Sequence, residues 1–368
     1  MSATNSTKPI LFNCLEIREL IYLPAYHFML WLCITSCFIS YILMIVFFWK
    51  FAFRLYWHLN IRILFYFNIF ISFVLATSLT WNFFGLFIRE LTSRKDCDEM
   101  VQLKDCAVLR WSFLIAFCLT TLNHTAIVIE RLWATIRLSK YEKSSAALGI
   151  FLVIITTLFA TFLVYLIMLD ENGEDYAPTC LYLSASAIGP NIYYLYIFQC
   201  VTEVLILALH KFLLWFNRRR VLLDWENLSH KYQAHENLAV LEQMSPMIIA
   251  CTLTIFGYNV IAFAIRPLRD YFTKNQYIII LFAAFTIQYM PFILNSIACY
   301  MAHQHQKYRA EQGRKSVALD KSANANFSNN VYNWDSAYSF RYDQQNTATR
   351  TGMRKWIGRT FSNRISAF

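Results

Sequence analysis

The sequence predicts an all-α membrane protein built as a bundle of seven transmembrane helices. Of its 368 residues, 57% are hydrophobic and only 15% are charged, whereas soluble domains carry about 25% charged residues. Seven apolar segments are long enough to cross a bilayer, and charged, proline-containing or glycine-containing stretches separate them. The loops between them differ strongly in charge, which is typical of a chain with a fixed orientation in a membrane.

A membrane-spanning helix needs about 20 predominantly apolar residues. The segments expected to span are 25–49, 63–88, 107–129, 146–169, 192–214, 247–265 and 276–301. The sixth is the shortest, and it is expected to end at Arg266, because the residue before a proline disfavours helical geometry.

The loop charges predict an extracellular N-terminus and a cytoplasmic C-terminus. The third inner loop contains five basic residues, namely Lys211, Arg218, Arg219, Arg220 and Lys231. Residues 170–190 contain four acidic residues and neither lysine nor arginine. Because lysine and arginine accumulate on the cytoplasmic side, this loop is expected outside. The net charge of +10 is then explained by anionic membrane lipids rather than by nucleic acid.

Three regions follow from this topology. An extracellular N-terminus covers residues 1–24, the seven-helix domain covers 25–301, and a cytoplasmic tail covers 302–368. Asn5 begins an Asn-Ser-Thr glycosylation sequence on the outer side. The tail is rich in Ser, Asn, Ala and Gln and is expected to be largely disordered. From Met353 on, apolar residues recur every four positions among basic ones, which fits either an amphipathic helix on the inner leaflet or an unstructured basic end.

The third span shows the most specific spacing. Cys106 and Arg131 are 25 residues apart, which in a helix is about 37 Å, the membrane core with its interfaces. This resembles rhodopsin-like receptors, which have the same interval between a cysteine and the arginine of an acid-Arg-aromatic motif. Here Glu130 precedes the arginine, but Leu132 replaces the aromatic residue. The resemblance implies that Arg131 engages a G protein; an interfacial Glu–Arg pair without signalling remains the alternative.

A narrower resemblance covers about residues 20–310. Residues 228–237 read LSHKYQAHEN, which resembles the Leu-Ser-x-basic-Tyr-Gln-x-x-Glu-Asn element of nematode serpentine receptors of the Sra superfamily, class alpha or alpha/beta. Other residues that match this family are Glu130 to Thr135, Pro246, Pro291, Asn295 and Tyr300. The alternative for residues 228–237 is a polar helical extension of the sixth span.

This family resemblance implies a chemosensory G-protein-coupled receptor in the plasma membrane, in sensory-neuron cilia. Its expected partners are a small odorant or pheromone-like ligand, a heterotrimeric G protein and membrane lipids, but not nucleic acid. Its G-protein-coupling residues are expected to be Glu130 and Arg131, with Glu236 and Glu242 as further acidic partners of the arginine. A ligand-gated channel or a transporter is the alternative function.

The resemblance to rhodopsin-like receptors also implies a disulfide between Cys106 and Cys180, the only cysteine in the acidic loop. Cys14 and Cys97 remain as a second possible outer pair. Four cysteines allow three pairings, and the sequence does not choose among them.

The outer half of the third span offers the candidate ligand-binding residues Arg110, Trp111, Phe113, Leu114 and Phe117. Phe113 occupies the position where amine receptors of the rhodopsin-like group have an aspartate. An apolar and aromatic lining favours a small uncharged or weakly polar ligand. Packing between helices, or contact with lipid, is the alternative role for these side chains.

Glu203 is the only acidic residue deep in a predicted span, with Thr120, Asn123 and His124 as candidate partners. Such a carboxyl group is either functional or a hydrogen-bonded lock between helices. The sequence contains no HExxH, GxSxG, P-loop or paired-cysteine zinc motif. We therefore expect no enzymatic activity, no cofactor and no metal site.

Overall fold

The computed structural model describes residues 24 to 323 with short gaps. The gaps are 53–56, 93–99, 138–140, 142–144, 170, 172–173, 175, 178, 182–190, 224–227, 266–267, 269–270, 274–275, 277–279 and 281–284. Asn5, Cys14, Cys97 and the basic segment from Met353 on lie outside the described residues.

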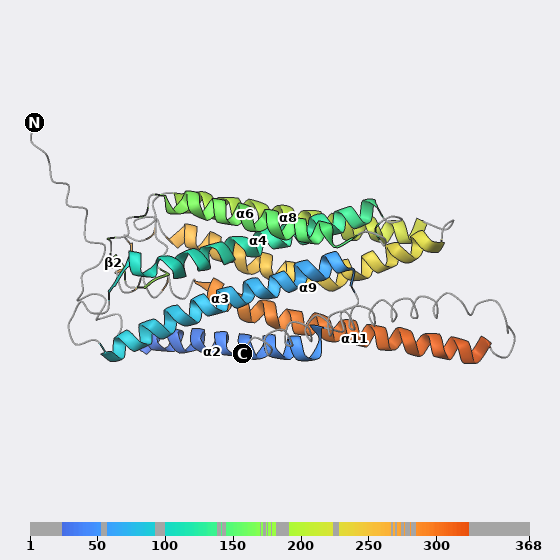
Figure 1. The fold of residues 1–368 in the computed structure, drawn as a ribbon, viewed down its shortest axis with the longest axis horizontal. Coiled ribbons are helices and arrows are strands. Elements are labelled where there is room, and N and C mark those ends of the chain that lie inside the picture. Colours follow the sequence, from blue (N-terminus) through green and yellow to red (C-terminus); the bar gives the residue numbers. More distant parts are fainter. Residues whose placement is uncertain are drawn as a thin grey trace, which may run out of the picture. The chain divides into compact units, whose positions relative to one another are not determined.

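The described part contains seven long helices (Figure 1). They are α2 (Pro24–Lys50), α3 (Leu59–Thr92), α4 (Ala107–Ile136), α6 (Ala147–Met168), α8 (Asn191–Leu223), α9 (Leu228–Ile265) and α11 (Met290–Ala323). Helices α2 to α9 include six stretches long and apolar enough to cross a membrane, and α11 supplies the seventh helix. The predicted seven-helix all-α bundle is confirmed.

The chain divides into two compact units, residues 1–306 and residues 307–368. The first contains the packed helices up to the first half of α11. Of the second, the structure describes only the end of α11.

Most helices are longer than the apolar segments that predicted them. The largest difference is in α9, which begins at Leu228 instead of residue 247 and contains Pro246. Its polar first part remains helical because it packs against α8. The length of the apolar segment therefore underestimates the length of the helix. The helical extension expected as the alternative for residues 228–237 is therefore present. The seventh helix begins with a 3-10 turn, η4 (Thr286–Tyr289), and Pro291 lies in the first turn of α11, where its missing N–H costs nothing.

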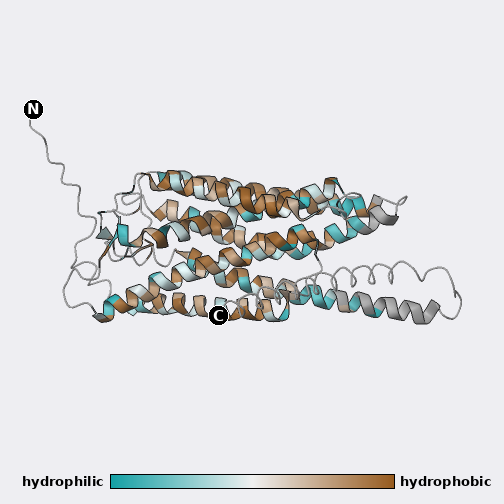
Figure 2. Ribbon diagram, viewed as in Figure 1, coloured by the Kyte–Doolittle hydropathy of each residue, from teal (hydrophilic) through white to brown (hydrophobic). Residues whose placement is uncertain are grey.

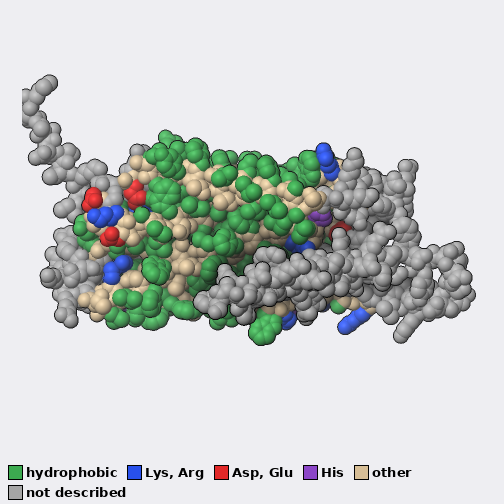
Figure 3. Space-filling view, in the orientation of Figure 1, with side chains coloured by type: hydrophobic (Ala, Val, Ile, Leu, Met, Phe, Trp, Pro, Cys, Tyr) green, Lys and Arg blue, Asp and Glu red, His purple; other side chains and the backbone are tan. Residues whose placement is uncertain are grey.

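The surface and the core show why this bundle belongs in a bilayer. Hydrophobic residues colour all the helices of the bundle, and the teal polar residues gather toward the ends (Figure 2). Large apolar side chains cover the middle of the visible surface, whereas charged groups lie toward its two ends (Figure 3). Ile45, Leu158 and Leu205 are each more than 60% exposed. Such an apolar band is explained by contact with lipid.

Helix α4 forms the centre of the bundle. It packs against α3, α6, α8 and α9, and 78% of its most apolar stretch is buried, compared with 28% for α6. Functional side chains on α4 can therefore reach three or four neighbouring helices.

Candidate functional site

One end of the bundle is organised around the start of α4, and we call it the disulfide end. Cys106 and Cys180 form a disulfide with a Cα–Cα distance of 5.2 Å, the pairing that the resemblance implied. Beside it, strand β1 (Val101–Gln102) pairs antiparallel with β2 (Tyr176–Ala177). The disulfide and the strand pair together hold the loop that follows α6 at the start of α4.

Arg110 lies one turn into α4 from the disulfide. Its side chain is fully buried, and its Nη1 lies 2.5 Å from Glu171 Oε1 of the same loop. Burial raises the pKa of Glu171, while the Arg110 guanidinium acts in the opposite direction. The Nε and Nη2 groups of Arg110 have no hydrogen-bond partner in the described part of the chain. Arg110 thus ties α4 to the loop and retains donors that an acceptor group can use.

An aromatic cluster lies next to Arg110. Phe113 stacks on Phe117, with ring centroids 6.3 Å apart, and lies 6.1 Å from Phe285. Tyr258 of α9 contacts both Phe117 and Phe285, at 5.8 and 5.5 Å, and its ring lies 5.9 Å from Tyr196 of α8. The cluster therefore joins α4, α8, α9 and the start of the seventh helix.

The structure brings together only some of the candidate ligand-binding residues. Phe113 and Phe117 belong to the aromatic cluster, Leu114 is fully buried in the core, and Trp111 is half-buried against it. Tyr196, Tyr258 and Phe285 lie far apart in the chain and were not among the residues predicted from the sequence. All three are aromatic residues in the predicted outer halves of their spans, and this position could have identified them as candidates.

Glu203 lies between three helices in the middle of the bundle. Its Oε1 accepts a hydrogen bond from Thr121 of α4 at 2.9 Å, and its Oε2 accepts one from Thr252 of α9 at 2.7 Å. These threonines, and not the three candidates expected from the sequence, are its partners. Of those candidates, Thr120 bonds its own helix, Asn123 bonds α3, and His124 has no hydrogen-bond partner in the described part. Glu203 thus has the geometry of a lock between α4, α8 and α9.

The opposite end of α4, which we call the Arg131 end, contains a buried ion pair. Arg131 donates from Nε to Glu130 Oε2 at 2.6 Å and from Nη2 to Glu130 Oε1 at 2.7 Å. Tyr141 accepts from Arg131 Nη2 at 2.8 Å and donates its own hydroxyl to Glu130. Burial raises the pKa of Tyr141 well above its ordinary value, which keeps the phenol protonated as a donor.

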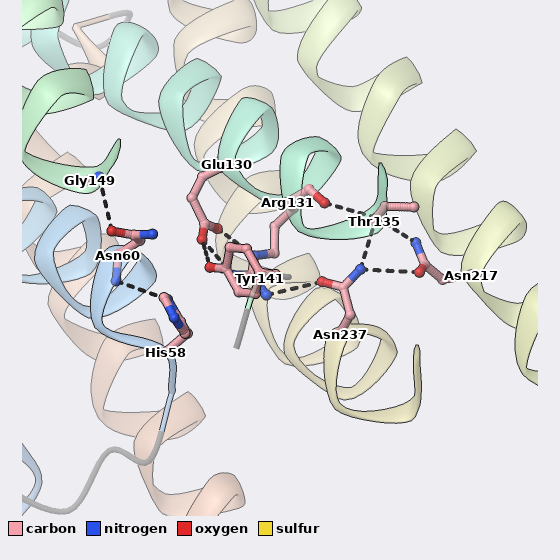
Figure 4. A network of polar contacts seen from close by, with 9 residues as sticks. All are labelled: His58, Asn60, Glu130, Arg131, Thr135, Tyr141, Gly149, Asn217 and Asn237. Carbon is pink, nitrogen blue, oxygen red and sulfur yellow. Dashed lines mark hydrogen bonds and ion pairs between the residues drawn. The ribbon is translucent and has the colours of Figure 1, made fainter. Parts of the chain in front are cut away.

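Asn237 connects this ion pair to two other helices (Figure 4). Its Oδ1 accepts from Arg131 Nη1 at 3.0 Å, and its Nδ2 donates to Thr135 Oγ1 at 2.8 Å and to Asn217 Oδ1 at 3.1 Å. Asn217 of α8 in turn donates to Thr135 Oγ1 at 3.0 Å. Both N–H donors and the carbonyl oxygen of the Asn237 amide are therefore bonded, and the amide links α9 to both α4 and α8.

Two acidic residues expected beside Arg131 have other positions. Glu236 is exposed, and its charge acts on Arg131. Glu242 instead pairs with Arg218, with an Nη2–Oε1 distance of 2.9 Å. The contact with Arg131 expected from an acid is made by the neutral amide of Asn237. Asn237 is the last residue of the LSHKYQAHEN segment, so the sequence did carry a signal for it.

The Arg131 end has the chemistry of a two-state contact. A buried ion pair is stable while both partners are in place, and losing one partner costs about 3–5 kcal/mol. If α9 moves away, Asn237 leaves, and Arg131 and Thr135 lose a partner together. Separating α4 from α9 therefore breaks the hydrogen bonds of Asn237 to Arg131 and Thr135, while the ion pair within α4 stays in place.

Comparison with known proteins gives an independent result. Residues 12–334 match a family described as serpentine type 7TM GPCR receptor class ab chemoreceptor. The chain is 30% identical over 344 residues to serpentine receptor class alpha-39 of Caenorhabditis elegans, which covers 92% of this chain and 91% of that protein. Two other receptors of the same organism are each 26% identical to the chain. For serpentine receptor class beta-16 the match covers 67% of this chain and 71% of that protein. For serpentine receptor class alpha/beta-14 it covers 56% of this chain and 55% of that protein.

Proposed function

Because the chain belongs to the serpentine class ab chemoreceptor family, we propose that it detects a small odorant-like or pheromone-like molecule and signals to a heterotrimeric G protein. In this proposal the disulfide end faces outward and the Arg131 end faces the cytosol. The receptor acts in the plasma membrane of sensory-neuron cilia and has no enzymatic role.

The network that joins Arg131 to Glu130, Tyr141 and Asn237 is the observation that carries this proposal. Two bonds to Glu130 of the same helix hold the Arg131 guanidinium in place. The contact between α4 and α9 is closed by the bonds of Asn237 to Arg131 and Thr135. A G protein needs a surface that exists in one state and is closed in another. Opening this contact would supply such a surface and free the Nη1 donor of Arg131.

The two ends can communicate through α9. Tyr258, in the aromatic cluster, and Asn237, in the polar network, are 21 residues apart on this helix, or about 31 Å along its axis. A ligand that displaces Tyr258 therefore acts on the helix that holds Asn237. Glu203 lies between the aromatic cluster and the polar network, and it accepts a hydrogen bond from Thr252 of α9. The contacts of Tyr258, Thr252 and Asn237 therefore all depend on the position of α9.

Nucleotide exchange on purified Gα tests the proposal. Arg131→Ala should abolish agonist-stimulated exchange at equal surface delivery, because the group that meets the G protein is gone. Glu130→Gln should instead raise basal exchange several-fold, because an amide holds the guanidinium less firmly than a carboxylate. Arg314 is an exposed arginine on a different helix, α11, and Arg314→Ala is the control. It should leave basal and agonist-stimulated exchange unchanged.

The increase expected for Glu130→Gln distinguishes signalling from misfolding, because a folding defect only lowers activity. Normal exchange with Arg131→Ala would remove Arg131 from the mechanism. Ligand-evoked current without any Gα would instead identify a channel. Labelling of a C-terminal tag on unpermeabilised cells would contradict the proposed orientation.

A further inference from the structure

An open groove lies between α8 and α9 toward the Arg131 end, outside the network described above. Its volume is about 570 Å³, and it is lined by Lys211, Leu214, Trp215, Arg218, Glu242 and Ser245. The four residues from α8 follow the spacing i, i+3, i+4 and i+7, so they form one face of that helix. We call this feature the α8–α9 groove.

The charges of the groove favour an anionic occupant. Arg218 and Glu242 form an ion pair across it, and both side chains are about half exposed. Lys211, two turns away, has no ion-pair partner among the residues that the structure describes. Lys211 is therefore the cation in excess in the groove. Arg218 is a second cation there, and its ion pair with Glu242 is solvent-accessible and therefore weak.

The position of the groove along α8 corresponds to the lipid headgroups. Lys211 follows the first residue of α8 by 20 positions, which is about 30 Å, the thickness of the hydrocarbon core. Phe212, Trp215 and Phe216 are between 39% and 50% exposed beside it. Aromatic side chains of this kind gather at membrane interfaces, and the apolar surface of α8 continues from there toward the membrane centre.

We propose that the α8–α9 groove binds the phosphate headgroup of an anionic phospholipid from the cytoplasmic leaflet. Lys211 neutralises the phosphate, Trp215 lines the headgroup, and the acyl chains lie along the exposed apolar face of α8. The phosphate competes with Glu242 for Arg218, so bound lipid weakens the ion pair between α8 and α9. The inference rests on the proposed function only in placing this end of the bundle at the cytosol.

Native mass spectrometry of the purified full-length chain tests this inference. The protein is titrated with phosphatidylinositol bisphosphate, and phosphatidylcholine serves as the neutral comparison. The wild type should bind the anionic lipid preferentially. The double variant Lys211→Gln/Arg218→Gln should lower its apparent affinity roughly twenty-five-fold, since each basic residue contributes about a factor of five near an anionic headgroup.

A matched control is available on α11. Lys307 and Arg314 are exposed and also seven residues apart, so Lys307→Gln/Arg314→Gln removes the same charges at the same spacing and should leave lipid affinity within twofold of the wild type. Glu242→Gln changes the affinity in the opposite direction. It frees Arg218 and should raise the affinity several-fold, which a variant that merely unfolds cannot do.

Equal lipid binding by the wild type and the groove double variant would overturn the inference. Binding of inorganic phosphate as tight as that of the lipid would overturn it as well, since the apolar wall would then have no role. A loss of G-protein coupling in the double variant at unchanged lipid affinity would identify a protein contact instead. Lipid binding is measured without a G protein, so failure of the proposed signalling function leaves this test intact.

Discussion

His58 brings a titratable group to the polar network from outside the membrane spans. Its Nδ1 accepts a hydrogen bond from the backbone N–H of Asn60 at 3.3 Å and so caps the start of α3. Its ring lies 4.2 Å from that of Tyr141. Burial lowers the pKa of His58 from 6.5 to about 4. A proton on Nδ1 would remove the cap and place a second cation near Arg131.

This arrangement predicts a loss of stability in mild acid. The pKa of His58 is lower in the folded state than in the unfolded state, so its contribution is complete above pH 6.5 and is lost as the pH falls toward about 4. The melting temperature of the wild type should fall across this window. His58→Asn keeps a capping side chain that does not titrate, so its profile should be flatter. Parallel profiles would contradict the prediction, and His303→Asn, at an exposed histidine, is the control.

Single residues also show what sequence reasoning can and cannot find. The interval from Cys106 to Arg131 identified the start of α4 and a residue in its last turns, because a helix converts residue number directly into length. The partner of Arg131 was harder to predict. Neighbouring positions on a helix differ by about 100° in direction, so whether Glu236 or Asn237 points inward depends on the rotation of α9. The polar first part of α9 lacks the apolar period that would show this rotation.

At the scale of elements, the contact between α3 and α6 depends on a glycine. Gly149 lies in the first turn of α6, and its N–H donates to Asn60 Oδ1 of α3 at 3.1 Å. A side chain of one helix thus satisfies a backbone donor that the other helix leaves unpaired. A Cβ at residue 149 would lie 2.9 Å from the Asn60 carbonyl oxygen and 3.0 Å from its Cα. These are backbone atoms, so the helices would have to move apart.

Gly149→Ala should therefore destabilise the receptor by about 1–3 kcal/mol. The matched control is Gly257→Ala in α9, where an added Cβ meets nothing within 4 Å. Alanine is the better helix former, so this control should be neutral or more stable by up to about 1 kcal/mol. Thermal unfolding of the two purified variants measures the difference. Equal melting temperatures would show that α3 and α6 adjust without cost.

The number of long helices and their order were predictable because each span needs an apolar run of a minimum length. Their ends were less so. Helix α9 starts 19 residues before its apolar run, since contacts such as that between Asn217 and Asn237 stabilise a polar helix outside the bilayer. Hydropathy does not record these contacts, which join residues on different helices.

At the scale of the whole molecule, the disulfide closes a loop that contains both α4 and α6. Its cysteines are 74 residues apart, and on the loop-entropy model such a bridge stabilises a fold by about 4 kcal/mol. Cys106→Ala and Cys180→Ala should each reduce surface delivery strongly and to the same extent. The double variant should show no further loss, because either substitution already removes the bridge.

Flow cytometry of an N-terminal tag on unpermeabilised cells measures this delivery. Cys200→Ala, at a half-buried free cysteine, is the control and should reach the surface normally. A double variant that is clearly worse than both single variants would show that the two cysteines act separately.

The short, lipid-facing helix α6 has a consequence for the choice of membrane. Its 22 residues give a length of about 33 Å, close to the thickness of a typical hydrocarbon core. The other five apolar spans are 27 to 34 residues long, so they can tilt or extend to match a thicker bilayer. Helix α6 has no spare length and the least buried surface of the six. Hydrophobic mismatch therefore acts first at α6, which spans a sterol-thickened core of about 32–33 Å only if it stands nearly upright.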